Sequence, residues 1–128
     1  KICQAFPMKY KFLNKQISFS LLLSNNPNIK KLNKYFRNKN KATDVLSFPL
    51  NKKIKISKKT YIGDIILSYN LIDKSKSHDL KIFKQELIKK FIHGFLHLLG
   101  FDHIKKKDYL IMQREEEQIY QSVISKLN

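Results

Sequence analysis

The chain has few of the residues that build disulfide-rich or membrane-spanning proteins. Cys3 is the only cysteine among 128 residues, which excludes an internal disulfide and any zinc site built from several cysteines. A metal ion would therefore have to bind histidine. No apolar run approaches the roughly 20 residues of a membrane-spanning helix, and residues 1–4 do not begin the long apolar core of a signal peptide. We therefore expect a cytoplasmic protein with no membrane association.

Acidic residues are also scarce, and their scarcity gives the chain a strong positive charge. Ten Asp and Glu stand against 26 Lys and Arg, so the formal net charge is +16 at pH 7. Such a chain attracts polyanions, and nucleic acid is the first candidate. Only two of the basic residues are arginine, and the chain is also rich in Asn, Ile, Phe and Tyr. Because A/T-rich codons encode lysine and these residues, genomic bias is an alternative source of part of the charge.

The order of apolar patterns predicts the fold class. No repeat or low-complexity linker divides the chain, and its length suits one domain over residues 1–128. Short apolar segments predict strands over residues 17–23, 45–49 and 61–68. Strands followed by long helices predict an α+β fold, in which a small mixed β-sheet packs against several helices, with a metal-binding helix near the C-terminus.

Polar residues mark the expected helix ends. Asn26 and Pro27 are typical of the N-cap and first position of a helix that continues to residue 36. Asp79 and Asp108 are the expected caps of two longer helices. Residues 115–117 form the only acidic cluster, which we expect to be a solvated helix face or to pair with nearby basic residues.

Three of the four histidines fall within residues 93–103, which read HGFLHLLGFDH. His93 and His97 are four residues apart, so one helical turn places their imidazoles on the same side. Gly100 can end that helix in the left-handed conformation, which lets the chain return and bring His103 toward the other two. Three imidazoles leave the fourth position of a tetrahedral zinc open to water, as in catalytic sites. We therefore predict that His93, His97 and His103 bind one zinc ion.

The alternative for these histidines is a solvated stripe. On a helical wheel His93 and His97 lie with Glu86 and Lys90, and apolar residues cover the other side. An isolated pair at this spacing is as well explained by exposure to water as by metal. The third histidine favours metal binding, because a bulky apolar helix end is an unusual place for surface histidines.

The same spacing occurs in the metzincin protease signature H-E-x-x-H-x-x-G-x-x-H, with one chemical difference. Gly94 stands where a protease has the glutamate that accepts a proton from zinc-bound water. Peptide hydrolysis by the usual route is therefore disfavoured. Gly94 also costs the helix about 1 kcal/mol relative to alanine. Either close approach by a substrate or a neighbouring backbone, or tight helix packing, would explain it.

Residues 93–103 resemble the H-G-x-L-H-L-x-G-[YF]-D-H signature of the YbeY family, bacterial endoribonucleases involved in rRNA maturation. Further stretches resemble that family in the same order along the chain, at residues 32–37, 43–49 and 63–68. The combination is far more specific than any one motif. Phe101 departs from the commoner tyrosine, which removes one hydroxyl near the expected metal site.

The resemblance implies a zinc-dependent, single-strand-selective endoribonuclease that acts in rRNA maturation and small ribosomal subunit quality control. It implies that His93, His97 and His103 are the metal ligands and that Arg37 is needed for RNA cleavage. The implied partners are single-stranded rRNA, the small ribosomal subunit and its assembly factors. Arg37 suits phosphate, because its planar guanidinium donates two hydrogen bonds and stays charged. The alternative is a helix-end arginine that binds exposed carbonyls.

The chemistry of the expected site leaves several roles open. Zinc can lower the pKa of bound water to about 7 and polarise a phosphoryl oxygen, so attack by water and attack by the RNA 2′-hydroxyl are both compatible with these residues. Asp102 could orient an imidazole, carry a proton or cap backbone amides. Phe48, Tyr61 and Phe101 are candidates for base stacking, with burial in the core as the alternative.

Two other functions fit parts of the pattern. A metzincin-like metallopeptidase shares the ligand spacing but lacks the glutamate. A non-catalytic ribosome-assembly protein would use zinc as a structural ion and its lysines to dock on rRNA. That second function predicts that replacing Arg37 changes nothing, whereas replacing His97 abolishes the fold.

Overall fold

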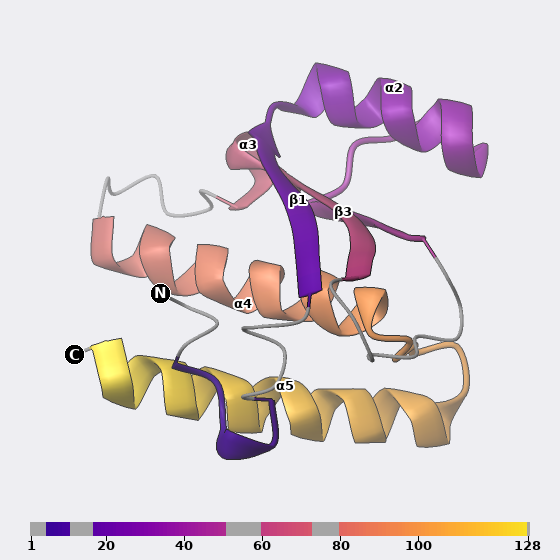
Figure 1. Cartoon of the computed structure of the whole chain (residues 1–128). Helices are drawn as coiled ribbons and strands as arrows, with labels where there is room; N and C mark the ends of the chain where they lie inside the picture. The colour runs from indigo at the N-terminus through magenta and orange to yellow at the C-terminus, as the bar shows by residue number, and fades with distance from the viewer. Residues whose placement is uncertain (1–4, 11–16, 51–59, 73–79, 128) are drawn as a thin grey trace.

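The computed structural model describes residues 5–10, 17–50, 60–72 and 80–127, and it confirms the α+β class. Its elements are η2 (Met8–Tyr10), β1 (Ile17–Ser24), α2 (Asn26–Arg37), β2 (Val45–Pro49), β3 (Thr60–Ser68), α3 (Tyr69–Ile72), α4 (Leu80–Leu98) and α5 (Lys106–Leu127). Helix α2 covers one face of the sheet, α4 covers the other, and α5 packs against α4 (Figure 1). None of the described helices has both the length and the apolar composition needed to cross a bilayer.

The predicted strands form one mixed sheet in the order β1-β3-β2. Strand β1 runs parallel to β3, and β2 runs antiparallel to it, with Ser47 opposite Ile65. Side chains alternate between the two faces of a strand. Leu46 and Phe48 therefore face α2, where they pack with Ile29, whereas Ser47 faces α4. Strand β2 thus touches both helices that frame the site.

Helix α2 has a different N-cap from the one that the sequence predicts. The side chain of Asn25 accepts a hydrogen bond from the backbone N–H of Asn28 at 3.0 Å, so Asn25 is the cap. The prediction of Asn26 is wrong by one residue. The side chain of Asn26 instead accepts a hydrogen bond from the hydroxyl of Ser68 at 2.6 Å, a partner that local sequence does not reveal.

Helix α4 carries a large share of the core on one side. Its buried large side chains are Phe91, Ile92, Phe95, Leu96 and Leu98. They share one cluster with Ile62, Ile65 and Leu67 of β3 and with Met112, Ile119 and Val123 of α5. Burying one such side chain contributes about 1.5–3 kcal/mol. The helix is therefore held firmly between the sheet and α5, which fixes the direction of its polar side.

Helix α5 begins at Lys106, two residues before the predicted cap. The N–H of Tyr109 already bonds to the carbonyl of Lys105 at 2.9 Å. Asp108 consequently lies inside the first turn, where its negative charge favours the positive end of the helix dipole. The other predicted cap, Asp79, lies outside the described residues.

Candidate active site

Helix α4 ends in a way that returns the chain toward its own histidines. Gly100 has a φ of 102°, which L side chains rarely adopt. Its N–H donates to the carbonyl of His97 at 3.0 Å, and the N–H of Phe101 donates to the carbonyl of Leu96 at 3.1 Å. These two bonds form a Schellman motif. The motif reverses the chain and brings His103 back beside the last turns of α4, as the sequence predicts.

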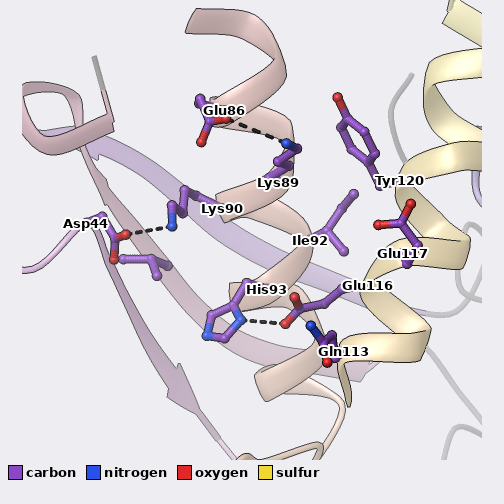
Figure 2. A pocket seen from close by; sticks show the side chains of 11 residues that line it. Asp44, Glu86, Lys89, Lys90, Ile92, His93, Gln113, Glu116, Glu117 and Tyr120 are labelled. Atoms are coloured by element: carbon purple, nitrogen blue, oxygen red, sulfur yellow. Dashed lines mark hydrogen bonds and ion pairs between the residues drawn. The ribbon is translucent and has the colours of Figure 1, made fainter. Parts of the chain in front are cut away.

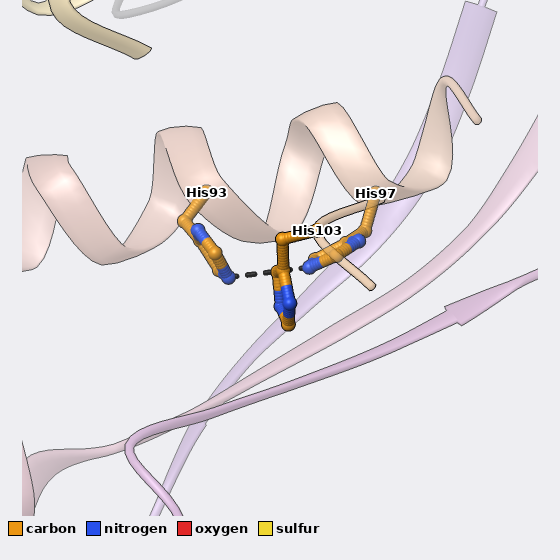
Figure 3. A group of neighbouring side chains, drawn as sticks. All are labelled: His93, His97 and His103. Atoms are coloured by element: carbon orange, nitrogen blue, oxygen red, sulfur yellow. Dashed lines mark hydrogen bonds between the residues drawn. The ribbon is translucent and has the colours of Figure 1, made fainter. Parts of the chain in front are cut away.

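The side chains of His93, His97 and His103 point toward one another (Figure 3). Each offers one ring nitrogen, and these nitrogens all lie within 4.8 Å of one another. His93 and His97 are partly buried, whereas His103 is exposed. The group could therefore hold a metal ion that a water molecule or a substrate reaches from solvent.

Hydrogen bonds to the outer nitrogens of two rings fix their tautomers. Nδ1 of His93 donates to the carboxylate of Glu116 at 2.6 Å, and Nδ1 of His97 donates to the carbonyl of Phe101 at 2.9 Å. Because a neutral imidazole has one N–H, both Nε2 atoms carry a lone pair whenever both rings are neutral. These Nε2 atoms lie 3.2 Å apart. Two lone pairs this close repel unless a proton or a cation lies between them, so the donor set fits a metal ion.

Spacing and charge also suit a metal. Two nitrogens at the usual bond length around a tetrahedral zinc lie about 3.3 Å apart, close to the 3.2 Å between the Nε2 atoms of His93 and His97. Burial and the nearby His93 lower the pKa of His97. His97 is therefore neutral at neutral pH, which is the form of imidazole that binds metals.

Arg37 reaches the same region from the end of α2. Asn38 adopts the left-handed conformation, with a φ of 56°, and ends the helix directly after Arg37. Nη2 of Arg37 donates to the carbonyl of Ser47 on β2 at 3.0 Å. The bonded carbonyl thus belongs to a strand and not to the helix that carries the arginine. This bond uses one of the five N–H donors of the guanidinium and directs it across the edge of β2.

Arg37 and the three histidines line one open cavity of about 570 Å³. The other lining residues are Lys39, Thr43, Asp44, Val45, Ser47, Asp102 and Ile104. A volume of this size is typical of small-ligand sites. The cavity brings together all four residues that the sequence analysis selected, and their individual roles stay predictions.

A second cavity, of about 430 Å³, lies between α4 and α5 on another side of His93 (Figure 2). His93 and Asp44 line both cavities. Lys90 pairs with Asp44 at 2.8 Å, and Lys89 pairs with Glu86 at 3.6 Å. Four carboxylates and two lysines line this cavity, so it lacks the excess of positive charge that a polyanion needs. A phosphate is better accommodated on the Arg37 side.

Gly94 packs α4 tightly against the sheet, which favours the packing explanation for this glycine. A Cβ here would lie 2.9 Å from Oγ of Ser47, 3.0 Å from a methyl of Val45 and 3.1 Å from a methyl of Ile65. The hydroxyl of Ser47 also donates to the carbonyl of Gly94 at 2.9 Å. A side chain at this position would run into the sheet. The glutamate of a metzincin would therefore fit here only if these neighbours moved.

Other residues that the sequence analysis considered have structural partners. The carboxylate of Asp102 accepts a hydrogen bond from the N–H of Ile104 at 3.3 Å, which agrees with backbone capping. Phe48 packs against the α2 cluster, and Phe101 packs against the main core. The hydroxyl of Tyr61 donates to the carboxylate of Asp64. The partial burial of Phe48 and Phe101 agrees with packing in the core, the alternative to base stacking.

Glu116 is a site residue that the sequence analysis did not select: residues 115–117 are expected to be a solvated face or to pair with nearby basic residues, and neither alternative predicts its contact with His93. The buried residues of α5 nearest to it are Met112, Ile119 and Val123. Together with Glu116 these positions follow a spacing of four, three and four, which is the period of a buried helix face. A charged residue at a position of this apolar period is the sequence signal that could have identified Glu116.

Known proteins are similar in sequence to nearly the whole of this chain. The profile of the family described as Endoribonuclease YbeY matches residues 1–124. An endoribonuclease YbeY of Pelagibacter ubique is 56% identical over 126 residues, which cover 98% of this chain and 82% of the relative. One from Buchnera aphidicola is 46% identical over 95 residues, which cover 74% of this chain and 61% of the relative.

A solved structure resembles the fold as well. The solution structure of a Thermotoga maritima protein matches with a TM-score of 0.59 and 27% identity, over 88% of this chain and 71% of that one. The family profile spans nearly the whole chain, and the relative from Pelagibacter ubique exceeds half identity over almost all of it. The chain therefore belongs to the YbeY family of endoribonucleases.

Proposed function

We propose that this chain is a zinc-dependent, single-strand-selective endoribonuclease that cleaves RNA at the cavity lined by Arg37, His93, His97 and His103. One observation carries the proposal: a guanidinium suited to phosphate and a three-imidazole group face the same cavity, in a chain of the YbeY family. A phosphodiester group in this cavity would be within reach of both.

The residues around the cavity have distinct roles in this proposal. Bound zinc would supply Lewis acidity, which lowers the pKa of water and polarises a phosphoryl oxygen. The guanidinium of Arg37 binds phosphate oxygens and stabilises the negative charge that develops in the transition state. Glu116 and the carbonyl of Phe101 hold His93 and His97 with Nε2 directed into the site.

We further propose that the substrate is rRNA and that the enzyme acts in rRNA maturation and small-subunit quality control, with the small ribosomal subunit and its assembly factors as partners. The net charge of +16 supports a polyanionic partner. Three exposed lysines at residues 105–107, soon after His103, would bind phosphates beside the cavity. Such an enzyme would work in the cytoplasm, where ribosomes are assembled.

The test compares metal-stripped and zinc-reconstituted protein on a labelled single-stranded RNA and on the same RNA annealed to its complement. We expect cleavage of the single strand only, restored by one equivalent of zinc and absent from His97→Ala. Equal background cleavage by every sample would contradict the proposal. Co-sedimentation with purified small subunits then tests the ribosomal partner, with large subunits as the control.

The two rival functions have less support. A metallopeptidase would need a glutamate at position 94, where the chain has a glycine packed tightly against the sheet. A purely structural zinc is compatible with the bond from Arg37 to the carbonyl of Ser47, but it gives no reason for the guanidinium to line the same cavity as the three histidines. Cleavage of an unstructured peptide, with RNA left intact, would revive the first rival. Full activity of Arg37→Ala in cells would revive the second.

A further inference from the structure

Two aromatic side chains lie exposed on the last turn of α2, immediately before Arg37. Tyr35 is 80% exposed and Phe36 is 59% exposed. Large aromatic side chains gain free energy when they are buried, so two adjacent exposed rings need a reason. Neither Tyr35 nor Phe36 is among the aromatic residues that the sequence suggested for base stacking.

These rings begin a continuous series that leads to the cavity. The ring centres of Tyr35 and Phe36 lie 4.8 Å apart, and those of Phe36 and Phe48 lie 5.3 Å apart. The guanidinium carbon of Arg37 lies 6.0 Å from the centre of the Phe48 ring. Arg37 in turn lines the cavity that contains the histidines. A ligand could therefore contact the cavity and the exposed rings at once.

The segment that carries the rings is rich in positive charge. Residues 26–41 contain six basic side chains and no acidic one. The six are Lys30, Lys31, Lys34, Arg37, Lys39 and Lys41, and all are exposed. Exposed aromatic rings set among cations are typical of surfaces that bind single-stranded nucleic acid, since the cations bind phosphates and the rings stack on bases.

We propose that Tyr35 and Phe36 form a stacking platform for unpaired bases of single-stranded RNA next to the phosphate held at Arg37. This inference rests on the proposed nuclease function and adds a binding site for the flanking nucleotides. Bases in a duplex are stacked and paired with one another, so they cannot stack on side chains without unpairing. The platform would therefore contribute to single-strand selectivity as well as to affinity.

The absence of tryptophan from this chain allows a direct test. Phe36→Trp places one indole on the platform of the zinc-loaded protein, and its emission is followed as a short 2′-O-methyl phosphorothioate single strand, which resists cleavage, is added. We expect saturable quenching by the base-bearing strand and little by an abasic strand of the same length. Tyr69→Trp is the matched control, because Tyr69 is 47% exposed at the start of α3. Its neighbour Asn70 bonds to Asn26, at the opposite end of α2 from the platform.

Affinity gives a second, independent measurement. Phe36→Leu keeps an apolar side chain but removes the flat ring, so it should weaken binding of the base-bearing strand by at least about fivefold and leave abasic binding unchanged. Tyr35→Leu should act in the same direction. Circular dichroism verifies that the variants fold, as the exposure of both rings leads us to expect. Equal affinity of wild type and both variants for the base-bearing strand would overturn the platform, as would equal quenching of the two tryptophan variants.

The same samples separate this inference from the proposed function. If the wild type cleaves unmodified RNA but the variants bind the base-bearing strand as tightly as the wild type does, the platform is wrong and the nuclease stands. If binding depends on the rings but zinc-loaded wild type cleaves no RNA, the platform stands and the nuclease proposal fails. If the variants weaken abasic and base-bearing binding equally, the rings do not stack on bases and the platform is overturned.

Discussion

The carboxylate of Glu116 lies 2.6 Å from Nδ1 of His93, and this contact joins α5 to the helix that carries two of the three clustered histidines. It orients His93 so that Nε2 lies 3.2 Å from Nε2 of His97. The contact thus ties the geometry of the cluster to the packing of the two longest described helices.

Replacing Glu116 should weaken metal binding without unfolding the protein. Removal of a carboxylate that orients a metal-binding histidine typically costs ten- to a hundredfold in metal affinity, so we expect a loss of about that size for Glu116→Ala. Glu116→Gln, which keeps an acceptor oxygen but not the charge, should lose less. Competition with a chromogenic zinc chelator measures the affinity.

The matched control for this prediction is Glu117→Ala. Glu117 is the next residue on α5, is exposed, and accepts a hydrogen bond from Gln121 at 2.8 Å. We expect its zinc affinity to equal that of the wild type. If both variants bind zinc like the wild type, Glu116 has no role in orienting His93.

Gly94→Ala should destabilise the protein even though alanine is the better helix former. Propensity alone would add about 1 kcal/mol of stability. The new methyl would, however, lie 2.9–3.1 Å from Ser47, Val45 and Ile65, and overpacking of this kind costs about 1–3 kcal/mol. We expect a net loss in the free energy of unfolding measured with urea. A gain in stability would contradict this prediction and would show that the neighbouring side chains of the sheet move to accommodate the methyl group.

Glu115 should make stability depend on pH in the acidic range. It accepts hydrogen bonds from Lys9 at 2.8 Å and from Tyr10 at 2.5 Å, which fasten η2 to α5. Burial raises the pKa of Glu115, but the hydrogen bonds and charge of Lys9, the hydrogen bond of Tyr10 and the charge of Arg114 outweigh it and lower the pKa below its ordinary value.

The sign of that dependence follows from linkage. Because the pKa of Glu115 is lower in the folded state, the unfolded state binds more protons in the acidic range. The contribution of the ionised Glu115 carboxylate to the free energy of unfolding is therefore present above the unfolded pKa of about 4.3. It is lost as the pH falls through the folded pKa. Wild type should lose more stability than Glu115→Gln between about pH 5 and pH 3 in urea titrations. Parallel curves would contradict this prediction.

The central motif could be predicted because its geometry is local. His93 and His97 are related by one helical turn, and Gly100 supplies the reversal that returns His103. The strands of the sheet followed from short apolar runs in the same way. Features whose geometry depends on a few consecutive residues can therefore be predicted from the sequence of those residues.

The features that sequence analysis missed depend on contacts between distant residues. Glu116 meets His93 across 23 positions, and the hydroxyl of Ser47 meets the carbonyl of Gly94 across 47. The N-cap of α2 is Asn25, and the side chain of Asn26 instead accepts a hydrogen bond from Ser68, 42 residues away. Such pairs are set by how the helices pack on the sheet and on one another, and local patterns do not contain that information.

The proposed cleavage chemistry depends most on Arg37, and one measurement tests this dependence directly. The rate of cleavage of a labelled single-stranded RNA is compared for zinc-loaded Arg37→Ala and Arg114→Ala, with the zinc content of each measured by atomic absorption. The chain has only these two arginines, and Arg114 is exposed on α5. Loss of a group that stabilises transition-state charge costs about a hundredfold or more in kcat. We predict such a loss for Arg37→Ala alone, with one zinc bound to both variants. Equal rates for the two would contradict a role of Arg37 in cleavage.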